Sequence, residues 1–248
     1  MNSRPNDWVL GDDIVAAVFG VDGVIIDIVR PCAAAWKWVL DPFLRSYALV
    51  REAEFTPFDI DDDYMRHMYA KSRLDGIRDF LTSRDVMLPY DDLRGLACRA
   101  EEVFLAGVRR SGIAVVDSTV TMIRTARRRG IRTAAVSADR HATELLSSAG
   151  VAELFDVRLD GLDAPGIRLP AHCEPGLLLE AARRLDAPPI RTAVVDESLA
   201  AMSAGRCAGF GLVVGVDHIG RAATLRGHGA DVVVTDLSQI PVLEPAMA

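Results

Sequence analysis

The sequence predicts an α/β fold, a doubly wound parallel sheet interrupted after its first strand by an all-helical insert. Short apolar runs typical of buried parallel strands occur at residues 14–19 and again from residue 133 onward. The later runs alternate with segments of helical periodicity, which is typical of a sheet covered by helices on both faces. Between residues 30 and 112 the apolar spacing is helical, with no strand pattern.

The individual elements follow from apolar spacing and from turn residues. Strands are expected at residues 14–19, 133–136, 155–159, 192–195, 212–216 and 232–234. Helices are expected at residues 31–50, 75–84, 92–110, 118–129, 142–149, 175–185 and 199–207. We therefore predict a core domain of residues 13–29 plus 113–236, a helical domain of residues 30–112 and a loose C-terminal tail of residues 237–248.

Composition narrows the range of functions. The 248 residues include 28 Lys and Arg against 35 Asp and Glu, a formal net charge of −7, so bulk electrostatics do not favour nucleic acid. The four cysteines are widely separated and form no CxxC pair, so neither disulfides nor a zinc site is expected. No signal pattern opens the chain, and no apolar run approaches the ~20 residues of a membrane span. We expect a soluble, cytoplasmic protein that binds no membrane.

Chemistry-bearing residues cluster in four segments, each just after a predicted core strand. The segments are residues 19–27, 136–140, 170–176 and 194–198. In a parallel sheet of this kind, ligands bind outside the carboxyl ends of the strands. The sequence therefore predicts one site built from all four segments.

The order and spacing of these segments resemble the motifs of the haloacid dehalogenase (HAD) superfamily of phosphotransferases, within it the β-phosphoglucomutase-like branch. The similarity extends from about Ile14 to Asp236 and includes residues 73–81 of the helical insert. The resemblance implies a HAD-like, Rossmann-like core and makes the insert a cap domain that selects the substrate.

The first motif lacks its first acidic residue. In the family it reads Asp-x-Asp-Gly, where the first Asp attacks phosphorus and the second is the general acid/base. This chain has Gly20 at the first position and keeps Asp22 at the second. Glycine carries no carboxylate, so the aspartyl-phosphate route at this position is closed and one Mg²⁺ ligand is lost.

The second and third motifs concern phosphate binding. The resemblance assigns the Ser137 hydroxyl and the Ala138 backbone N–H to the phosphoryl oxygens; the alternative is that Ser137 only caps a helix. Alignment on Pro175 places His172 where the family has a lysine. The only lysines, Lys37 and Lys71, lie in the helical insert.

The fourth motif is acidic, with Asp196 followed by Glu197. The resemblance implies a Mg²⁺ site formed by these carboxylates and the backbone carbonyl of Asp22. Glutamate is longer than the aspartate that the family places second, and Mg²⁺ demands near-ideal octahedral distances. We therefore expect Mg²⁺ binding to be weak.

The insert carries Arg73, Asp75 and Arg78, which match the cap pattern of the family. The resemblance implies a small phosphorylated ligand, with a sugar phosphate as the first candidate. The alternative is that these residues are surface charges at a helix start.

Three hypotheses of function remain. The favoured one is a catalytically inactive or strongly impaired HAD-like phosphatase/phosphomutase with a phosphosugar pocket and a binding or regulatory role. The second is an active Mg²⁺-dependent phosphoric-ester hydrolase or mutase, in which Asp22 activates a water nucleophile. The third is a ligand-free protein-interaction module, whose partner the sequence does not identify.

Overall fold

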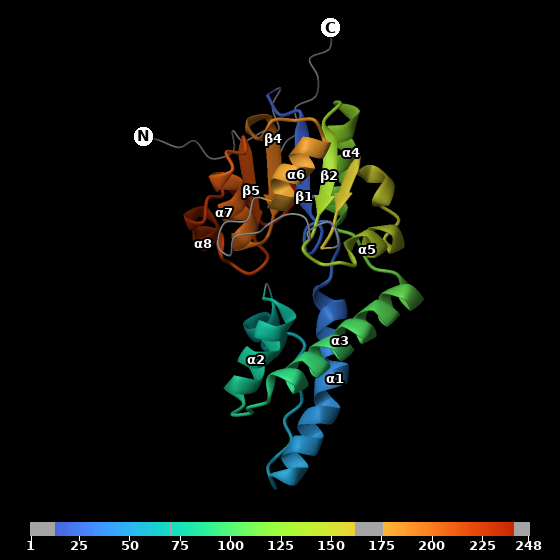
Figure 1. The fold of residues 1–248 in the computed structure, drawn as a ribbon, viewed down its shortest axis with the longest axis vertical. Helices are drawn as coiled ribbons and strands as arrows, with labels where there is room; N and C mark the ends of the chain where they lie inside the picture. Colours follow the sequence, from blue (N-terminus) through green and yellow to red (C-terminus); the bar gives the residue numbers. More distant parts are fainter. Residues whose placement is uncertain (1–12, 70, 162–175, 241–248) are drawn as a thin grey trace. The chain divides into compact units, whose positions relative to one another are not determined.

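The computed structural model describes residues 13–69, 71–161 and 176–240, which form two compact units. One unit contains residues up to Ile26 and from Ala114 onward; the other is Asp27–Ile113. Figure 1 shows the first unit as a sheet with helices and the second as helices alone. The predicted fold class, a parallel α/β sheet with an all-helical insert, is confirmed.

The sheet has six strands, all parallel, in the order β3-β2-β1-β4-β5-β6. The strands are β1 (Ala16–Gly20), β2 (Arg132–Val136), β3 (Val157–Leu159), β4 (Thr192–Asp196), β5 (Leu212–Val216) and β6 (Val232–Val234). β1 lies between β2 and β4, and all five of its residues are buried. Each predicted strand is present, within a few residues of its expected bounds.

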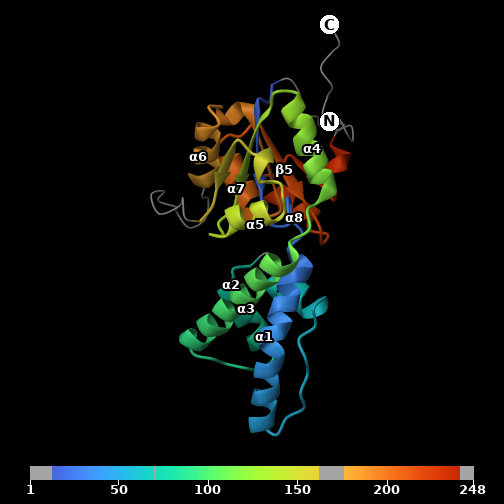
Figure 2. The same cartoon turned by 90° about the vertical axis from the view of Figure 1, so that its right-hand side faces the viewer.

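Helices cover both faces of this sheet. The helices of this unit are α4 (Asp117–Arg128), α5 (Ala142–Ser148), α6 (Gly176–Arg184), α7 (Leu199–Cys207) and α8 (Ala222–Gly227). On one face, alternate strand residues such as Val18 and Val194 pack with Leu178 of α6, Met202 of α7 and Leu225 of α8. Figure 2 shows α6 and α7 on one side of the sheet and α4 on the other. This explains why the strands are apolar throughout, since neither face meets water.

Short elements complete this unit. They are the 3₁₀ turns η2 (Ala152–Leu154), η4 (Pro189–Arg191) and η5 (Leu237–Gln239). Leu237 and Ile240 are buried, so packing continues past the boundary predicted at residue 236.

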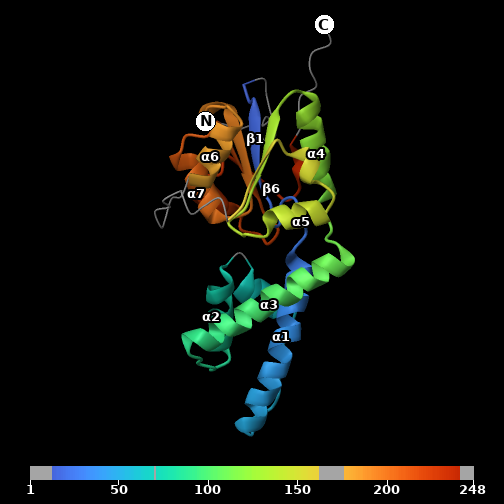
Figure 3. The same ribbon diagram turned by 45° about the vertical axis from the view of Figure 1, so that its right-hand side comes forward.

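The helical unit consists of α1 (Val29–Val50), the π-helix η1 (Tyr64–Met68), α2 (Arg73–Ser83) and α3 (Tyr90–Ser111). α1 and α3 cross one another and make the main contact of the unit (Figure 3). The apolar faces of α1, α2 and α3 meet in one core that includes Leu40, Phe58, Phe80 and Leu96. The helical insert therefore has its own hydrophobic core.

No helix in the described part of the chain combines the length and apolar character needed to cross a bilayer.

Candidate active site

The loop after β1 is a tight, buried turn that carries Asp22. Val21 N–H donates to the Val136 carbonyl (3.0 Å), which ties the loop to β2. Gly23 N–H donates to the Ile26 carbonyl (3.0 Å), and Gly23 has φ +71°, a backbone region in which side chains are strained. The turn therefore fixes Asp22, which is partly buried, at the carboxyl end of β1.

Ser137, at the end of β2, holds the Asp22 side chain. Its hydroxyl donates to Oδ2 of Asp22 (2.9 Å) and accepts from Asp139 N–H (2.9 Å). Its own N–H donates to the Leu159 carbonyl (3.1 Å), and the residue is 9% exposed. The structure thus brings together two predicted site residues, with the next residue, Ala138, exposed beside them. A ligand that binds the Ser137 hydroxyl must compete with Asp22 for its proton.

Asp196, at the end of β4, leans into the space beside Gly20. Phe19 of β1 pairs with Val195 of β4, so Gly20 and Asp196 follow at equivalent positions of neighbouring strands. A Cβ atom built on Gly20 would overlap Oδ2 of Asp196 and lie 2.9 Å from its Cγ. The position that lacks an acidic side chain is therefore filled by the acidic side chain of the adjacent strand.

The Asp196 carboxyl is desolvated but partly compensated by hydrogen bonds. Burial raises the pKa of Asp196 above its ordinary value, while donors from Ser198 and from Glu197 N–H act in the opposite direction. Ser198 N–H donates to Oδ1 of Asp196 (2.7 Å), and the Ser198 hydroxyl caps α7 by accepting from Ala201 N–H (3.1 Å). The start of α7 therefore holds one oxygen of this carboxylate in place.

Glu197 lies against the first loop instead of beside Asp196. A Cβ atom on Gly23 would overlap the Glu197 carboxyl group, and Glu197 is only 8% exposed. His218 Nε2 is 2.9 Å from the Gly23 carbonyl oxygen and 3.9 Å from Oε2 of Glu197. Glu197 and His218 both contact Gly23 and so stabilise the turn that carries Asp22.

His218 was not found by the sequence analysis. It follows β5 by two residues, at the same edge of the sheet as the four motifs. Beside it, the buried Asp217 accepts from the N–H groups of Ile219 (3.1 Å) and Arg221 (2.9 Å). Burial raises the pKa of Asp217, but these backbone donors outweigh it and leave the pKa lowered. Applying the strand-end rule to β5 as well would have identified both residues.

The acidic residues predicted to bind Mg²⁺ do not form one cluster. Among the described residues, the carboxylate oxygens of Asp22, Asp196 and Glu197 do not all lie within 4.8 Å of one another. Mg²⁺ requires close, near-octahedral oxygen ligands. The predicted site takes its ligand from the backbone carbonyl of Asp22 and not from its carboxylate, so weak Mg²⁺ binding at this edge stays a prediction.

The predicted ligand residues of the insert are engaged within the helical unit. Arg73 lies 3.5 Å from Glu101, and Arg78 lies 3.1 Å from Asp75. Asp75 also belongs to the cap of α2, where its N–H donates to the Ser72 hydroxyl (3.1 Å). These contacts fit a helix start, and a sugar-phosphate role for these residues stays a prediction.

Both lysines of the chain are also paired in the helical unit. Lys37 lies 2.9 Å from Asp41, and Lys71 lies 2.6 Å from Asp79. His172, predicted at the lysine position of the third motif, lies outside the described residues.

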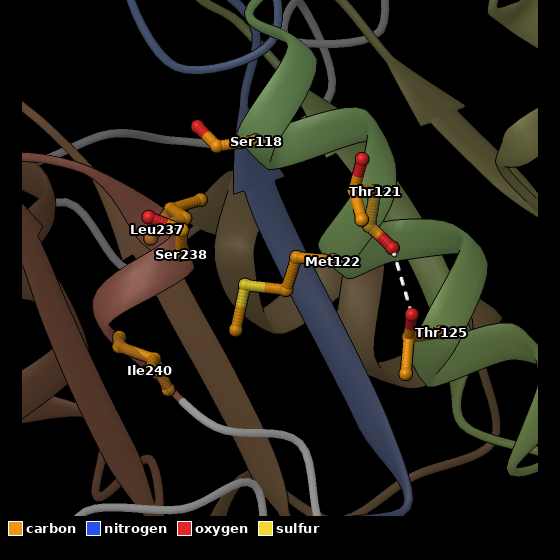
Figure 4. Close-up of a pocket in the computed structure, with 7 residues that line it drawn as sticks. All are labelled: Ser118, Thr121, Met122, Thr125, Leu237, Ser238 and Ile240. Carbon is orange, nitrogen blue, oxygen red and sulfur yellow. Dashed lines mark hydrogen bonds between the residues drawn. The ribbon is translucent and has the colours of Figure 1, made fainter.

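A pocket of about 360 Å³ lies between α4 and η5, away from the motif residues. Figure 4 shows Met122 and Ile240 directed into it, with Thr121 and Thr125 on α4. The Thr125 hydroxyl donates to the Thr121 carbonyl (2.9 Å), and the Ser118 hydroxyl at the rim donates to Asp236 (2.8 Å). The lining is mostly apolar and includes none of the predicted site residues.

Asp22 follows the central strand β1 of a parallel sheet, and its side chain accepts a hydrogen bond from Ser137, which follows the neighbouring strand β2. This arrangement is an acidic site at the strand ends of a phosphotransferase-type fold. Comparison with known proteins agrees with this. Residues 14–209 match the family model of haloacid dehalogenase-like hydrolases, and the chain belongs to that family.

Proteins of similar sequence identify the branch of this family. The chain is 32% identical over 243 residues to Beta-phosphoglucomutase of Mycobacterium tuberculosis (strain CDC 1551 / Oshkosh), a match that covers 93% of each protein. It is 39% identical over 131 residues to Trehalose-phosphate phosphatase of Mycobacterium leprae, covering 51% of this chain and 29% of that protein. The prediction of a HAD-like protein of the β-phosphoglucomutase-like branch is confirmed.

Solved structures show the same fold. A HAD family hydrolase from Deinococcus radiodurans R1, with bound phosphate and sodium, superposes with a TM-score of 0.68 at 24% identity. The match covers 92% of this chain and 94% of that one. The chain is therefore a HAD-family hydrolase of the phosphatase and phosphomutase type in its fold and ancestry.

Proposed function

We propose that this protein binds a phosphorylated sugar at the carboxyl edge of its sheet and turns it over slowly or not at all. The observation that carries the proposal is the Gly20–Asp196 contact. Position 20 offers no carboxylate, and its space is filled by Asp196. An aspartyl-phosphate at position 20 cannot form, so the covalent step of active relatives is missing there.

A phosphorylated ligand is supported by retained features and by relatives. Asp22 and Ser137 remain joined at the mouth of the site. Two relatives bear names that specify phosphorylated sugars, a phosphoglucomutase and a trehalose-phosphate phosphatase. In this proposal the role is binding or regulation in the cytoplasm, and Mg²⁺ binds weakly because position 20 offers no carboxylate and Glu197 is longer than aspartate.

The second candidate is hydrolysis by an activated water. Ser137 holds Asp22 in one orientation, which is what a general base requires. General-base catalysis contributes about 10²–10⁴-fold, far less than a complete phosphoryl-transfer site supplies.

The test measures binding and turnover separately. Calorimetry with β-glucose 1-phosphate, trehalose 6-phosphate and inorganic phosphate, with and without Mg²⁺, reports binding; phosphate release reports turnover. Ser137→Ala removes a predicted phosphate contact, and Ser147→Ala, whose exposed hydroxyl donates to the Thr143 carbonyl within α5, is the matched control. We expect saturable binding that weakens in Ser137→Ala alone, with little phosphate release.

Two outcomes contradict the proposal in different ways. Lack of saturable binding to any of the probes would favour the ligand-free interaction module. Rapid turnover that Asp22→Asn abolishes would establish the water mechanism as the main function.

A further inference from the structure

We propose that Asp196 takes over the place of the missing side chain at position 20 and accepts the phosphoryl group in a slow transfer. The carboxylate that forms the covalent intermediate has then moved from β1 to β4. This inference rests on the proposed function, because it requires a phosphorylated ligand in the same site. It adds the residue through which the remaining turnover proceeds.

Strand register brings Asp196 to this place. β1 and β4 are neighbours in the sheet, and neighbouring strands lie about 4.8 Å apart. Val18 and Val194 pair and share one core, so two residues later Gly20 and Asp196 face the same side. With no Cβ at position 20, the Asp196 carboxylate moves sideways until its Oδ2 occupies that volume.

The environment of Asp196 suits a nucleophile. Ser198 N–H fixes Oδ1 at 2.7 Å, so Oδ2 is the oxygen directed towards Gly20.

The other two acidic residues of the site, Glu197 and Asp22, are held by different contacts. The Glu197 carboxyl lies on Gly23, 3.9 Å from His218. Asp22 is held by the Ser137 hydroxyl at 2.9 Å and keeps the acid/base position of the motif. Asp196 is therefore the carboxylate best placed to replace residue 20.

The reaction balances with these two groups and water. Oδ2 of Asp196 forms a bond to phosphorus while the bond from phosphorus to the ester oxygen breaks, and Asp22 gives its proton to that oxygen. Water then attacks phosphorus and returns a proton to Asp22. The bond between phosphorus and Oδ2 breaks, which releases inorganic phosphate and restores the Asp196 carboxylate.

The experiment traps the acyl phosphate and locates it. Protein is incubated with p-nitrophenyl phosphate, whose leaving group needs no acid, then quenched and reduced with borohydride, which converts an aspartyl phosphate to homoserine. The tryptic peptide of residues 192–206 contains only two acidic residues, Asp196 and Glu197, and the first motif lies in the peptide that ends at Lys37, because trypsin does not cleave the Arg30–Pro31 bond. Mass spectrometry therefore distinguishes the candidate acceptors.

The Asp22→Asn variant is expected to increase the amount of aspartyl phosphate that can be trapped. Without a base to activate water, breakdown of the adduct slows by about 10²–10⁴-fold, so the adduct accumulates. We expect homoserine at position 196 in this variant, none when Asp196→Asn is added, and an unchanged amount when Asp156→Asn is added. Calorimetric titration with inorganic phosphate is run on every variant.

The outcomes separate the two proposals. Homoserine at position 196 supports the inference; homoserine at Asp22 in the wild-type protein, or a modified Glu197 in either protein, overturns it. Saturable phosphate binding in Asp22→Asn without any adduct also overturns it but leaves the proposed function intact. Absence of phosphate binding in the wild-type protein and in every variant contradicts both this inference and the proposed function.

Discussion

The two sides of β1 present different contacts at the carboxyl edge of the sheet. On the β2 side, Asp22 and Ser137 remain joined by a 2.9 Å hydrogen bond. On the β4 side, β1 ends in Gly20, and the carboxylate of Asp196 lies where a side chain of residue 20 would begin. Glu197 on that side has turned to Gly23 and His218. Both sides contain hydrogen bonds, but only on the β4 side do acidic side chains also pack closely against glycines.

At this sheet edge, a glycine of one strand leaves room for an acidic side chain of the neighbouring strand. Removing an acidic side chain leaves a void and relieves repulsion, and a neighbouring acidic side chain can use both. A Cβ atom at Gly20 would overlap the Asp196 carboxylate, and one at Gly23 would overlap the Glu197 carboxylate. The positions of these two acidic side chains therefore require glycine at residues 20 and 23. Each prediction below breaks one of these contacts.

The largest effect on stability is expected for Gly23→Ala. Alanine at φ +71° is strained, and its Cβ would overlap the Glu197 carboxyl group, so we expect a loss of about 2–4 kcal/mol in the free energy of unfolding. Urea unfolding measures it. The control is Gly130→Ala, because Gly130 has φ +77° with nothing within 4 Å of an added Cβ, and this variant reports strain alone. Equal losses in the two variants would contradict the Glu197 contact.

Gly20→Ala is expected to cost about 1–3 kcal/mol, because its Cβ forces Asp196 away from its position and from Ser198 N–H. The loss should be smaller when Asp196→Ala is added, and a double-mutant cycle by urea unfolding measures this coupling. Additive losses would show that the two residues do not share the space.

On the β2 side, Ser137→Ala removes the hydrogen bonds to Asp22 and from Asp139 N–H, with an expected cost of about 1–2 kcal/mol. The matched control is Ser147→Ala, whose exposed hydroxyl only donates to the Thr143 carbonyl within α5. Thermal unfolding of the two variants should differ clearly. A loss as small as that of the control would mean that the Asp22–Ser137 contact contributes little.

The smallest effect concerns pH. Burial raises the folded-state pKa of Asp196 above the ordinary 3.8, so the folded state binds its proton more tightly than the unfolded state does. This contribution to stability is present below pH 3.8 and is lost as pH rises through the folded-state pKa. Asp196→Asn keeps an acceptor for Ser198 N–H but has no charge, so its stability relative to wild type should increase over that pH range. A pH-independent difference in unfolding free energy would contradict the raised pKa.

The sequence alone was sufficient to predict the sheet, because β1, β4 and β5 are uninterrupted apolar runs between turn residues. The sequence alone did not predict the short polar helices. Helix α8 has only six residues, Ala222–Gly227, with one buried side chain, so apolar spacing could not reveal it. The π-helix Tyr64–Met68 follows three consecutive aspartates and reads as a polar stretch.

For the site, the chain shows which residues stand at the strand ends but not which way their side chains turn. That Asp22 and Ser137 lie at one edge of the sheet could be predicted, because each follows a predicted parallel strand; the hydrogen bond between them was not predicted. The approach of Asp196 to Gly20 depends on strand register and on a side-chain rotation into empty space. The turning of Glu197 towards Gly23 depends on the left-handed backbone of that glycine, which sequence alone does not reveal.

The central place of β1 also has a consequence for biosynthesis. Ala16 pairs with Arg132 on one side and with Thr192 on the other, so its partners come 116 and 176 residues later (132 − 16 and 192 − 16). At about 5–20 residues per second, a ribosome needs roughly 6–23 s to make the first partner after β1 itself. During that time this apolar strand has neither neighbour, while all of the insert Asp27–Ile113 has been synthesised. β1 is therefore the segment of the nascent chain with the greatest need of protection from aggregation.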